Sequence, residues 1–173
     1  MTDSYDAIVV GTGISGGWAA KELCEKGLKT LVLERGPMVQ HPVDYPTANM
    51  DKWDFKGGDK ITQEIRKRQP KQSRTNYVNT ESTSHFFVDD NVHPYNEVKR
   101  FDWIRGYHVG GRSLLWGRQS YRMSDFDFEA NAKDGIAVDW PIRYKDLAPW
   151  YSYVEKYVGI SGEKLGLPHL PDS

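Results

Sequence analysis

The sequence has a single cysteine, no long hydrophobic run and almost no net charge, and each absence excludes a class of protein. Cys24 has no partner within the chain, so an intramolecular disulfide is impossible. No apolar run approaches the roughly 18 residues that a membrane-spanning helix requires. The net charge of −1 gives no general attraction to nucleic acid or to an anionic membrane. We therefore expect neither a nucleic-acid partner nor a membrane span.

The first structured pattern begins a few residues after Met1, which leaves no room for a signal peptide or a twin-arginine leader. On this ground we expect a cytoplasmic chain. The length of 173 residues accommodates one domain or slightly more. Cys24 lies in a helical pattern, where we expect it as a small buried side chain.

A strand, a glycine-rich loop, a helix and a second strand are predicted in sequence between residues 6 and 34. The apolar run 7–10 predicts a strand buried on both faces. Residues 18–25 have the apolar spacing of a helix, which Gly27 would end. The apolar run 31–33 predicts a second buried strand.

The loop of this unit has the pattern G-x-G-x-x-G, formed by Gly11, Gly13 and Gly16. Gly11 permits a tight turn, Gly13 allows a pyrophosphate to approach the backbone, and Gly16 allows the helix to pack closely on the strand. Glu34 follows Gly16 by 18 residues, where a carboxylate can accept hydrogen bonds from an adenosine ribose. The combination predicts a dinucleotide site, and a glycine-rich turn without a ligand is the alternative.

Residues 38–100 differ from this unit in composition. They contain few aliphatic residues, many Asn, Asp, Lys and Pro, and scattered aromatics. We predict a long irregular arm or lid that packs its aromatic side chains on a missing part of the same protein or on another subunit. Residues 61–68 are expected to form a short helix that ends before Pro70.

The arm also carries a basic cluster and two histidines. The basic residues between Lys60 and Arg74 are interrupted by acidic ones, so we interpret them as a solvated face rather than an anion or nucleic-acid site. No metal-ligand spacing surrounds His85 or His93, and no metal site is predicted.

A second glycine pair, Gly110 and Gly111, offers backbone N–H groups to an anion. The Ser113 hydroxyl and the guanidinium group of Arg105 or Arg112 can add donors and positive charge. Residues 114–116 would supply an apolar, flat wall. A ligand with two phosphates and a flat ring requires this combination, whereas a turn followed by a buried strand is the alternative.

The last third of the chain is predicted to be helical and then irregular. Residues 124–127 have the character of a helix N-cap. Residues 144–157 have amphipathic spacing, with Gly159 as the terminator and Pro149 near the first turn. The tail 165–173 is polar and contains no closing strand.

Two blocks, RGYHVGGRSLLWG at 105–117 and DWPIRYKDLAPWYSYVEKYVGISG at 139–162, together with the N-terminal fingerprint, resemble the glucose–methanol–choline (GMC) oxidoreductases. They are most similar to the branch of bacterial sugar dehydrogenases and pyranose oxidases, which includes the large subunits of gluconate 2-dehydrogenase and glucoside 3-dehydrogenase. The resemblance implies an α/β fold with a Rossmann-like FAD-binding domain of the GMC type, incomplete in this chain, with a long irregular arm. The three expected regions are 1–37, the N-terminal βαβ unit; 38–100, the arm; and 101–173, a second flavin-contacting block and a following helix in a truncated domain.

The resemblance also implies how FAD would be held. The N-terminal glycines and Glu34 would hold its ADP half, residues 109–113 would follow the pyrophosphate and ring, and residues 115–117 would lie beside the isoalloxazine. Pyranose oxidases have a covalently bonding histidine at the position of Leu115, so FAD should be noncovalent here. Many alcohol-oxidising members have Asn at the position of Trp116, which favours the sugar branch. The implied cofactor-binding residues are Gly11, Gly13, Ile14, Ser15, Gly16, Glu34, Arg35, Gly110, Gly111, Arg112, Ser113, Leu115, Trp116 and Gly117.

The implied activity is oxidation of a CH–OH group of a sugar or other alcohol by hydride transfer to FAD, followed by electron transfer to an acceptor. Family members take their catalytic histidine from a C-terminal segment that this sequence does not contain. The catalytic residues are therefore unassigned, and the chain alone is expected to be inactive. His108 is expected to be a packing residue or one that supports a neighbouring site residue, rather than one that touches substrate. The alternatives are a noncatalytic flavin-binding or interaction fragment that needs a partner chain, and an NAD-dependent dehydrogenase, in which the block 105–117 would have no role.

Related sugar dehydrogenases imply further partners. These are the missing C-terminal part, a small subunit that carries an export leader, and a cytochrome that accepts electrons. Export with such a subunit would give a periplasmic location despite the bare N-terminus.

Overall fold

The computed structural model describes residues 4–75 and 77–173 and divides the chain into two compact units, Met1–Trp116 and Gly117–Ser173. Residues 1–3 of the first predicted region and residue 76 of the second lie outside the described residues. The predicted three-part division stays a prediction.

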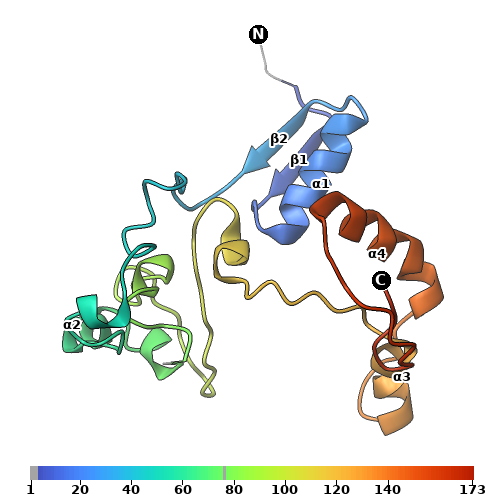
Figure 1. Ribbon diagram of the computed structural model, residues 1–173. Coiled ribbons are helices and arrows are strands. Elements are labelled where there is room, and N and C mark those ends of the chain that lie inside the picture. Colours follow the sequence, from blue (N-terminus) through green and yellow to red (C-terminus); the bar gives the residue numbers. More distant parts are fainter. Residues whose placement is uncertain (1–3, 76) are drawn as a thin grey trace. The chain divides into compact units, whose positions relative to one another are not determined.

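The first unit begins with two parallel strands joined by a helix (Figure 1). Strand β1 is Ala7–Val10, helix α1 is Ile14–Glu25 and strand β2 is Thr30–Leu33. The strands pair in register from Ala7 with Thr30 to Val10 with Leu33. The chain thus contains α/β structure with a short parallel sheet, as the alternation of apolar runs and helical spacing predicts.

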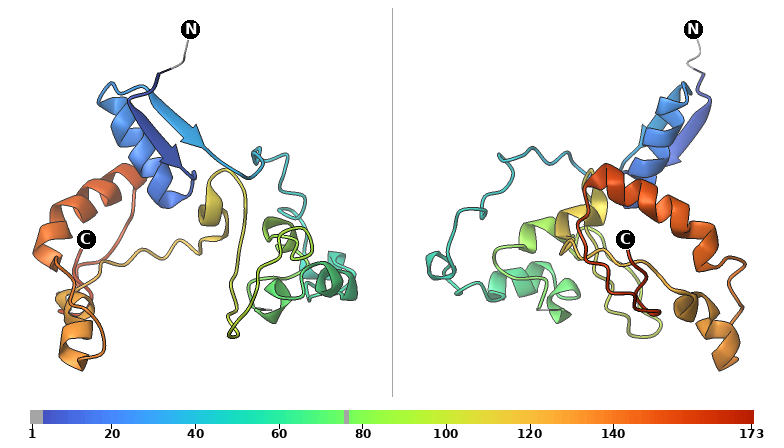
Figure 2. Two further views of the ribbon diagram at one scale, coloured as in Figure 1. Left: turned by 180° about the vertical axis from the view of Figure 1, so that it is seen from behind. Right: turned by 45° about the vertical axis from the view of Figure 1, so that its right-hand side comes forward.

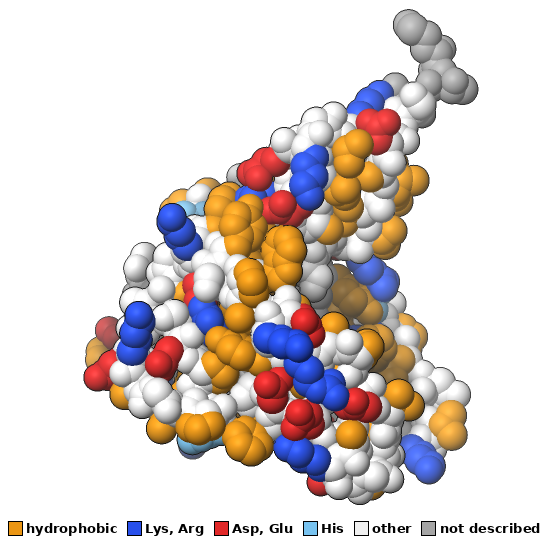
Figure 3. Space-filling model, turned by 90° about the vertical axis from the view of Figure 1, so that its right-hand side faces the viewer, with side chains coloured by type: hydrophobic (Ala, Val, Ile, Leu, Met, Phe, Trp, Pro, Cys, Tyr) orange, Lys and Arg blue, Asp and Glu red, His pale blue; other side chains and the backbone are white. Residues whose placement is uncertain are grey.

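Burial of these strands differs from the prediction of two fully buried strands. Val9 is buried, but Ile8 and Val10 are 63% and 81% exposed, and Leu33 is 48% exposed. Successive side chains of a strand point to opposite faces, and the contacts of α1 with both strands account for only one face. The prediction of burial on both faces is therefore wrong for the chain as described, and hydrophobic side chains are visible at the molecular surface in Figure 3.

Cys24 is also more exposed than predicted. It lies on α1, as expected, but its side chain is exposed. Helix α1 contains no buried residue, because the two strands are too narrow to cover more than part of it. The prediction of a buried cysteine is wrong for the same reason as the prediction of buried strands.

The arm, residues 38–100, is irregular, as predicted (Figure 2). Its helical segments are short: α2, Gln63–Arg68, and the 3-10 helices η1, η2 and η3 at Lys52–Asp54, Gln72–Arg74 and Ser84–Phe86. Helix α2 matches the short helix expected before Pro70 and begins after Thr62, whose hydroxyl accepts a hydrogen bond from the Ile65 N–H. Its basic side chains are exposed, as the interpretation of a solvated face requires.

The arm has a core of its own, and this core is largely polar. The Gln69 side-chain amide donates to the carbonyl oxygens of Ser84 and Phe87 at 2.8 and 3.0 Å. Asp90 accepts from the Gln72 backbone N–H at 3.0 Å and pairs with the buried guanidinium group of Arg105 at 3.1 Å. These hydrogen bonds and this ion pair connect segments of the arm that no sheet or long helix joins, although the buried Arg105 Nε and Asn79 Oδ1 have no hydrogen-bond partner among the described residues.

Phe87 differs from the prediction that the aromatic side chains of the arm pack on a missing part of the protein or on another subunit. Phe87 is buried within the first unit beside Val88. Trp53 and Tyr77 are 80% and 78% exposed, as that prediction requires.

The second unit contains helices α3, Asp125–Asp134, and α4, Tyr144–Val158. Ser124 and Asp127 form a capping box at the start of α3, and Gly159 ends α4 with a left-handed φ of +79°. Pro149 is the sixth residue of α4 and thus lies just beyond its first turn, so the helix tolerates the loss of one backbone hydrogen bond there. Among the described residues, no helix is long and apolar enough to cross a membrane.

Candidate functional site

The turn from β1 into α1 requires glycine at two positions. Gly11 has a φ of +90°, which side chains rarely permit, and its N–H donates to the Leu33 carbonyl oxygen at 2.7 Å. A Cβ atom on Gly16 would lie 2.0 Å from the Gly11 carbonyl oxygen. The close packing of helix on strand that the fingerprint predicts is therefore present.

The N-terminus of α1 is open. A Cβ atom on Gly13, the residue that precedes the helix, would meet nothing within 4 Å, and Ile14 and Ser15 are exposed. The first N–H groups of an α-helix have no partners within the helix and carry its positive partial charge. The residues present thus fit a phosphate group, which could approach the backbone here without displacing a side chain.

The Glu34 carboxylate lies at the end of β2 and accepts four hydrogen bonds from the protein. One oxygen accepts from the Thr12 N–H at 2.8 Å and from the Thr12 hydroxyl at 2.6 Å. The other accepts from the N–H groups of Arg35 and Gly36 at 2.8 and 2.9 Å. The Thr12 hydroxyl, followed by the Gly36 and Thr12 N–H groups, lowers the pKa of Glu34 to about 2.

The second glycine block meets the first. The Gly110 N–H donates to the Thr12 hydroxyl oxygen at 3.0 Å, across 98 positions of sequence. A Cβ atom on Gly111 would lie 2.9 Å from the Gly13 Cα, so only glycine permits this approach. The predicted site residues at 11–16, 34 and 110–111 are thus brought together in one unit, although their role in holding a cofactor stays a prediction.

Residues 111–115 form the 3-10 helix η4, Gly111–Leu115, rather than the buried strand of the alternative interpretation. The Ser113 hydroxyl donates to the Gly110 carbonyl oxygen at 2.5 Å, and an Arg112 guanidinium nitrogen donates to the Ile104 carbonyl oxygen at 2.6 Å. Leu115 is half-buried and Trp116 is 40% exposed. Gly117 is the first residue of the second unit.

Arg105 is not available to a ligand. Its guanidinium group is buried, pairs with Asp90, and donates to the His93 carbonyl oxygen at 2.7 Å and to the Tyr107 hydroxyl at 3.3 Å. Of the two arginines proposed from the sequence to supply positive charge, Arg105 therefore belongs to the core of the arm and Arg112 is the exposed one.

Two contacts beside Glu34 were not predicted from the sequence. A Cβ atom on Gly36 would lie 2.1 Å from the Tyr107 carbonyl oxygen, so the chain after β2 runs directly against residues 107–109. The Arg35 guanidinium group lies 3.9 Å from the centre of the Tyr107 ring, as in a cation–π contact. Gly36 carried a sequence signal for the close approach, but nothing in the sequence indicated its partner.

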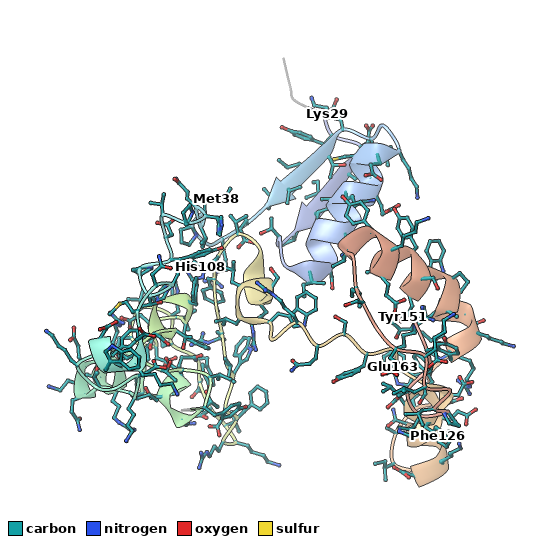
Figure 4. The ribbon with its side chains drawn as sticks, in the orientation of Figure 1. Lys29, Met38, His108, Phe126, Tyr151 and Glu163 are labelled. Carbon is teal, nitrogen blue, oxygen red and sulfur yellow. The ribbon has the colours of Figure 1, made fainter. Side chains whose placement is uncertain are left out.

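His85 and His108 line one hollow of about 420 Å³ together with Met38 and Phe86. Figure 4 labels two of these residues, Met38 and His108, which belong to the first unit. Burial lowers the pKa of both imidazoles below its usual value, and at His108 the negative charge of Glu34 opposes this effect. The packing role expected for His108 agrees with its edge contact to the Phe86 ring, whose centroid lies 6.0 Å away. Among the described residues, no three His, Cys, Asp or Glu side chains gather as they would around a metal ion.

Comparison with known proteins gives matches along most of the chain. The fructose dehydrogenase large subunit of Gluconobacter japonicus is 26% identical over 93% of this chain, and the gluconate 2-dehydrogenase flavoprotein of Pantoea cypripedii is 28% identical over 91%. The 2-methyl-1,2-propanediol dehydrogenase of Mycolicibacterium austroafricanum is 27% identical over 98%. The chain spans 28%, 25% and 27% of the lengths of these relatives. No protein-family model matches the chain.

These relatives are oxidoreductases, and an oxygen-dependent choline dehydrogenase of Xanthomonas axonopodis pv. citri is similar as well, at 28% identity. Two of them are dehydrogenase components designated a large subunit and a flavoprotein. The similarity extends through the arm and the block at 105–117, because it covers at least nine-tenths of the chain. The resemblance to the GMC oxidoreductases that the sequence predicts is confirmed by these relatives.

Proposed function

We propose that this chain is the N-terminal FAD-binding portion of a flavin-dependent oxidoreductase that oxidises a CH–OH group of a sugar or other alcohol. The observation that carries the proposal is the meeting of two glycine blocks at the open N-terminus of α1. The Gly110 N–H reaches the Thr12 hydroxyl at 3.0 Å, and Gly111 lies against Gly13. The names of the similar proteins support the class of reaction.

The residues of the first unit have distinct roles in this proposal. The N–H groups at the start of α1 would hold the pyrophosphate, because they are exposed and carry the positive end of the helix dipole. Glu34 is ionised at neutral pH, so both of its oxygens can accept hydrogen bonds from ribose hydroxyl groups. Its oxygens already accept four hydrogen bonds, so a ribose would share or replace some of these donors.

Residues 110–116 would lie along the rest of the cofactor. The half-buried Leu115 and the partly exposed Trp116 offer apolar surface to a flat ring, and leucine has no nucleophilic atom to bond to it. FAD, when bound, supplies the acceptor for the hydride. No residue of this chain is assigned as the base that takes the hydroxyl proton, so we expect the chain alone to be inactive.

The first experiment combines a visible spectrum with native and denatured mass measurements on the chain titrated with FAD. We expect a yellow complex that releases free FAD on denaturation, with NAD failing to compete at equal concentration. Flavin retained after denaturation would contradict the noncovalent assignment at Leu115. Binding of NAD in preference to FAD would overturn the proposed cofactor.

A noncatalytic flavin-binding or interaction role is the second candidate, and one observation favours it. The exposed apolar side chains of the sheet, Ile8, Val10 and Leu33, offer a surface for another polypeptide. In the proposed enzyme the same surface would contact the remainder of the protein. We include in the enzyme proposal a small subunit, a cytochrome that accepts electrons, and the periplasmic location that export with such a subunit would give. Their support is the name of one relative, which designates it a large subunit.

A further inference from the structure

We propose that Thr12 is a positioning residue, whose hydroxyl fixes the loop Gly110–Ser113 against the N-terminus of α1 and so assembles the dinucleotide site from its two halves. The inference rests on the proposed FAD site but assigns a role to a residue outside the three glycine positions of the G-x-G-x-x-G pattern. Thr12 occupies the variable position between Gly11 and Gly13.

The direction of each hydrogen bond at Thr12 follows from its partners. The Gly110 N–H can only donate, so the Thr12 oxygen accepts at 3.0 Å. The Glu34 carboxylate is ionised and can only accept, so the Thr12 hydroxyl donates its single proton at 2.6 Å. Both capacities of the hydroxyl are thus used in one relay from Gly110 through Thr12 to Glu34.

The relay connects the loop at Gly110 to the turn that precedes α1, and two other contacts near this junction do not replace it. Gly111 touches Gly13 by close approach of their backbones, which supplies fit but no directional bond. The Val109 N–H donates to the Pro37 carbonyl oxygen at 3.0 Å and fixes the loop on its other side. The Gly110–Thr12 bond is therefore a directional contact between the loop and the turn that precedes α1.

Loss of the hydroxyl has two consequences for the site. The Gly110 N–H would lose its acceptor, and the loop would be freer to leave Gly13. One Glu34 oxygen would lose its charge-assisted hydroxyl donor, although the Thr12 N–H remains. Because a net hydrogen bond contributes about 0.5–1.5 kcal/mol, we expect FAD affinity to fall by roughly 2- to 13-fold.

The test uses the full chain with three substitutions. Thr12→Val removes the hydroxyl and keeps the shape, whereas Thr12→Ser keeps the hydroxyl. Thr30→Val is the matched control, because the Thr30 hydroxyl donates to the Leu28 carbonyl oxygen at 3.2 Å, outside the site. Flavin fluorescence titration measures FAD affinity, and hydrogen exchange followed by NMR measures protection of the Gly110 N–H without cofactor.

We expect Thr12→Val to weaken FAD binding and to accelerate exchange of the Gly110 N–H. For Thr12→Ser and Thr30→Val, both the FAD affinity and the exchange rate should stay within about twofold of the values for the unaltered chain. Unchanged affinity and exchange in Thr12→Val would overturn the inference while leaving the FAD proposal intact. The FAD proposal would be overturned, and the positioning role retained, by a different result: the unaltered chain binds no FAD, but its Gly110 N–H exchanges more slowly than the Gly110 N–H of Thr12→Val. If Thr12→Val does not fold, exchange of the Gly110 N–H in the unaltered chain at the free-peptide rate would still overturn the inference.

Discussion

The βαβ unit and the arm, both in the first unit of the chain, differ in backbone regularity and in side-chain burial. In the βαβ unit the backbone is paired in a regular sheet and helix, yet apolar side chains such as Ile8 and Val10 are exposed. In the arm the backbone is irregular, yet Gln69, Gln72 and Asp90 are buried and hydrogen-bonded. Regular secondary structure and a buried interior are therefore separate properties in the first unit.

The difference indicates where each region obtains its stability. Side chain–backbone hydrogen bonds within a buried core hold the arm, so removal of one buried partner should be costly. The βαβ unit depends on close backbone packing at its glycines and lacks a covered outer face. Substitutions in the two regions should therefore differ in size and in what they affect.

The largest effect is expected from Asp90→Ala in the arm. This change leaves the Arg105 guanidinium group buried without its carboxylate, and breaking a buried pair costs about 3–5 kcal/mol. Chemical denaturation monitored by Trp fluorescence measures the loss. Asp102→Ala, which breaks exposed pairs with Arg74 and Arg100, is the control and should leave the transition nearly unchanged. Equal effects of the two changes would contradict the assignment of a buried polar core.

Sequence reasoning could find the βαβ unit but not this core. The apolar runs, the glycine spacing and Gly27 are local signals, because the elements that they specify form between near neighbours in sequence. Gln69 and Gln72 lie in polar, loop-like sequence, where hydrophobic periodicity gives no sign of burial. Their burial depends on Asp90 and Arg105, which come from later segments of the chain.

In the candidate site, too, local patterns could be predicted from the sequence, whereas contacts between distant segments could not. The glycines and Glu34 could be predicted because the chemistry of a dinucleotide fixes their spacing. The role of Thr12 could not be predicted, since it arises from the approach of Gly110 across the fold. The burial of β1 was overestimated because an apolar run shows that a strand can be buried but not what covers it.

The next largest effect is expected from Gly16→Ala in the βαβ unit. The new Cβ atom would lie 2.0 Å from the Gly11 carbonyl oxygen, so the turn or the helix must shift. We expect more than about 2 kcal/mol of destabilisation, the range of strongly overpacked positions, together with loss of FAD binding. Gly17→Ala is the matched control, because its Cβ atom would lie 3.9 Å from the nearest atom, the Thr12 carbonyl oxygen, and alanine favours the helix. Thermal unfolding and FAD titration of both variants measure the contrast, and a harmless Gly16→Ala would refute the close packing.

A smaller, pH-dependent effect is expected at Glu34. Its pKa is lowered from the ordinary 4.5 to about 2, so its hydrogen bonds stabilise the fold fully above about pH 5 and lose this contribution as the pH falls toward 2. Glu34→Gln has no such titration. Because Glu97 and Asp127 also have lowered pKa values, the informative quantity is the difference in unfolding free energy between the two proteins. This difference should shrink between pH 5 and pH 3, and a constant difference would show that the carboxylate is not held by these donors.

The smallest effect on stability is expected at Cys24, where the exposure of the βαβ unit can be measured directly. Cys24 lies on α1 and its side chain is exposed, so Cys24→Ser should change the free energy of unfolding by no more than about 0.5 kcal/mol. In the folded, unaltered chain a thiol reagent should label Cys24 at nearly the rate seen in denaturant. Slow labelling of the folded chain would mean that another surface covers α1. Association of two copies of the chain through the exposed side chains of the sheet and helix would be one such case. The labelling rate at increasing protein concentration separates these cases, because only association makes protection depend on concentration.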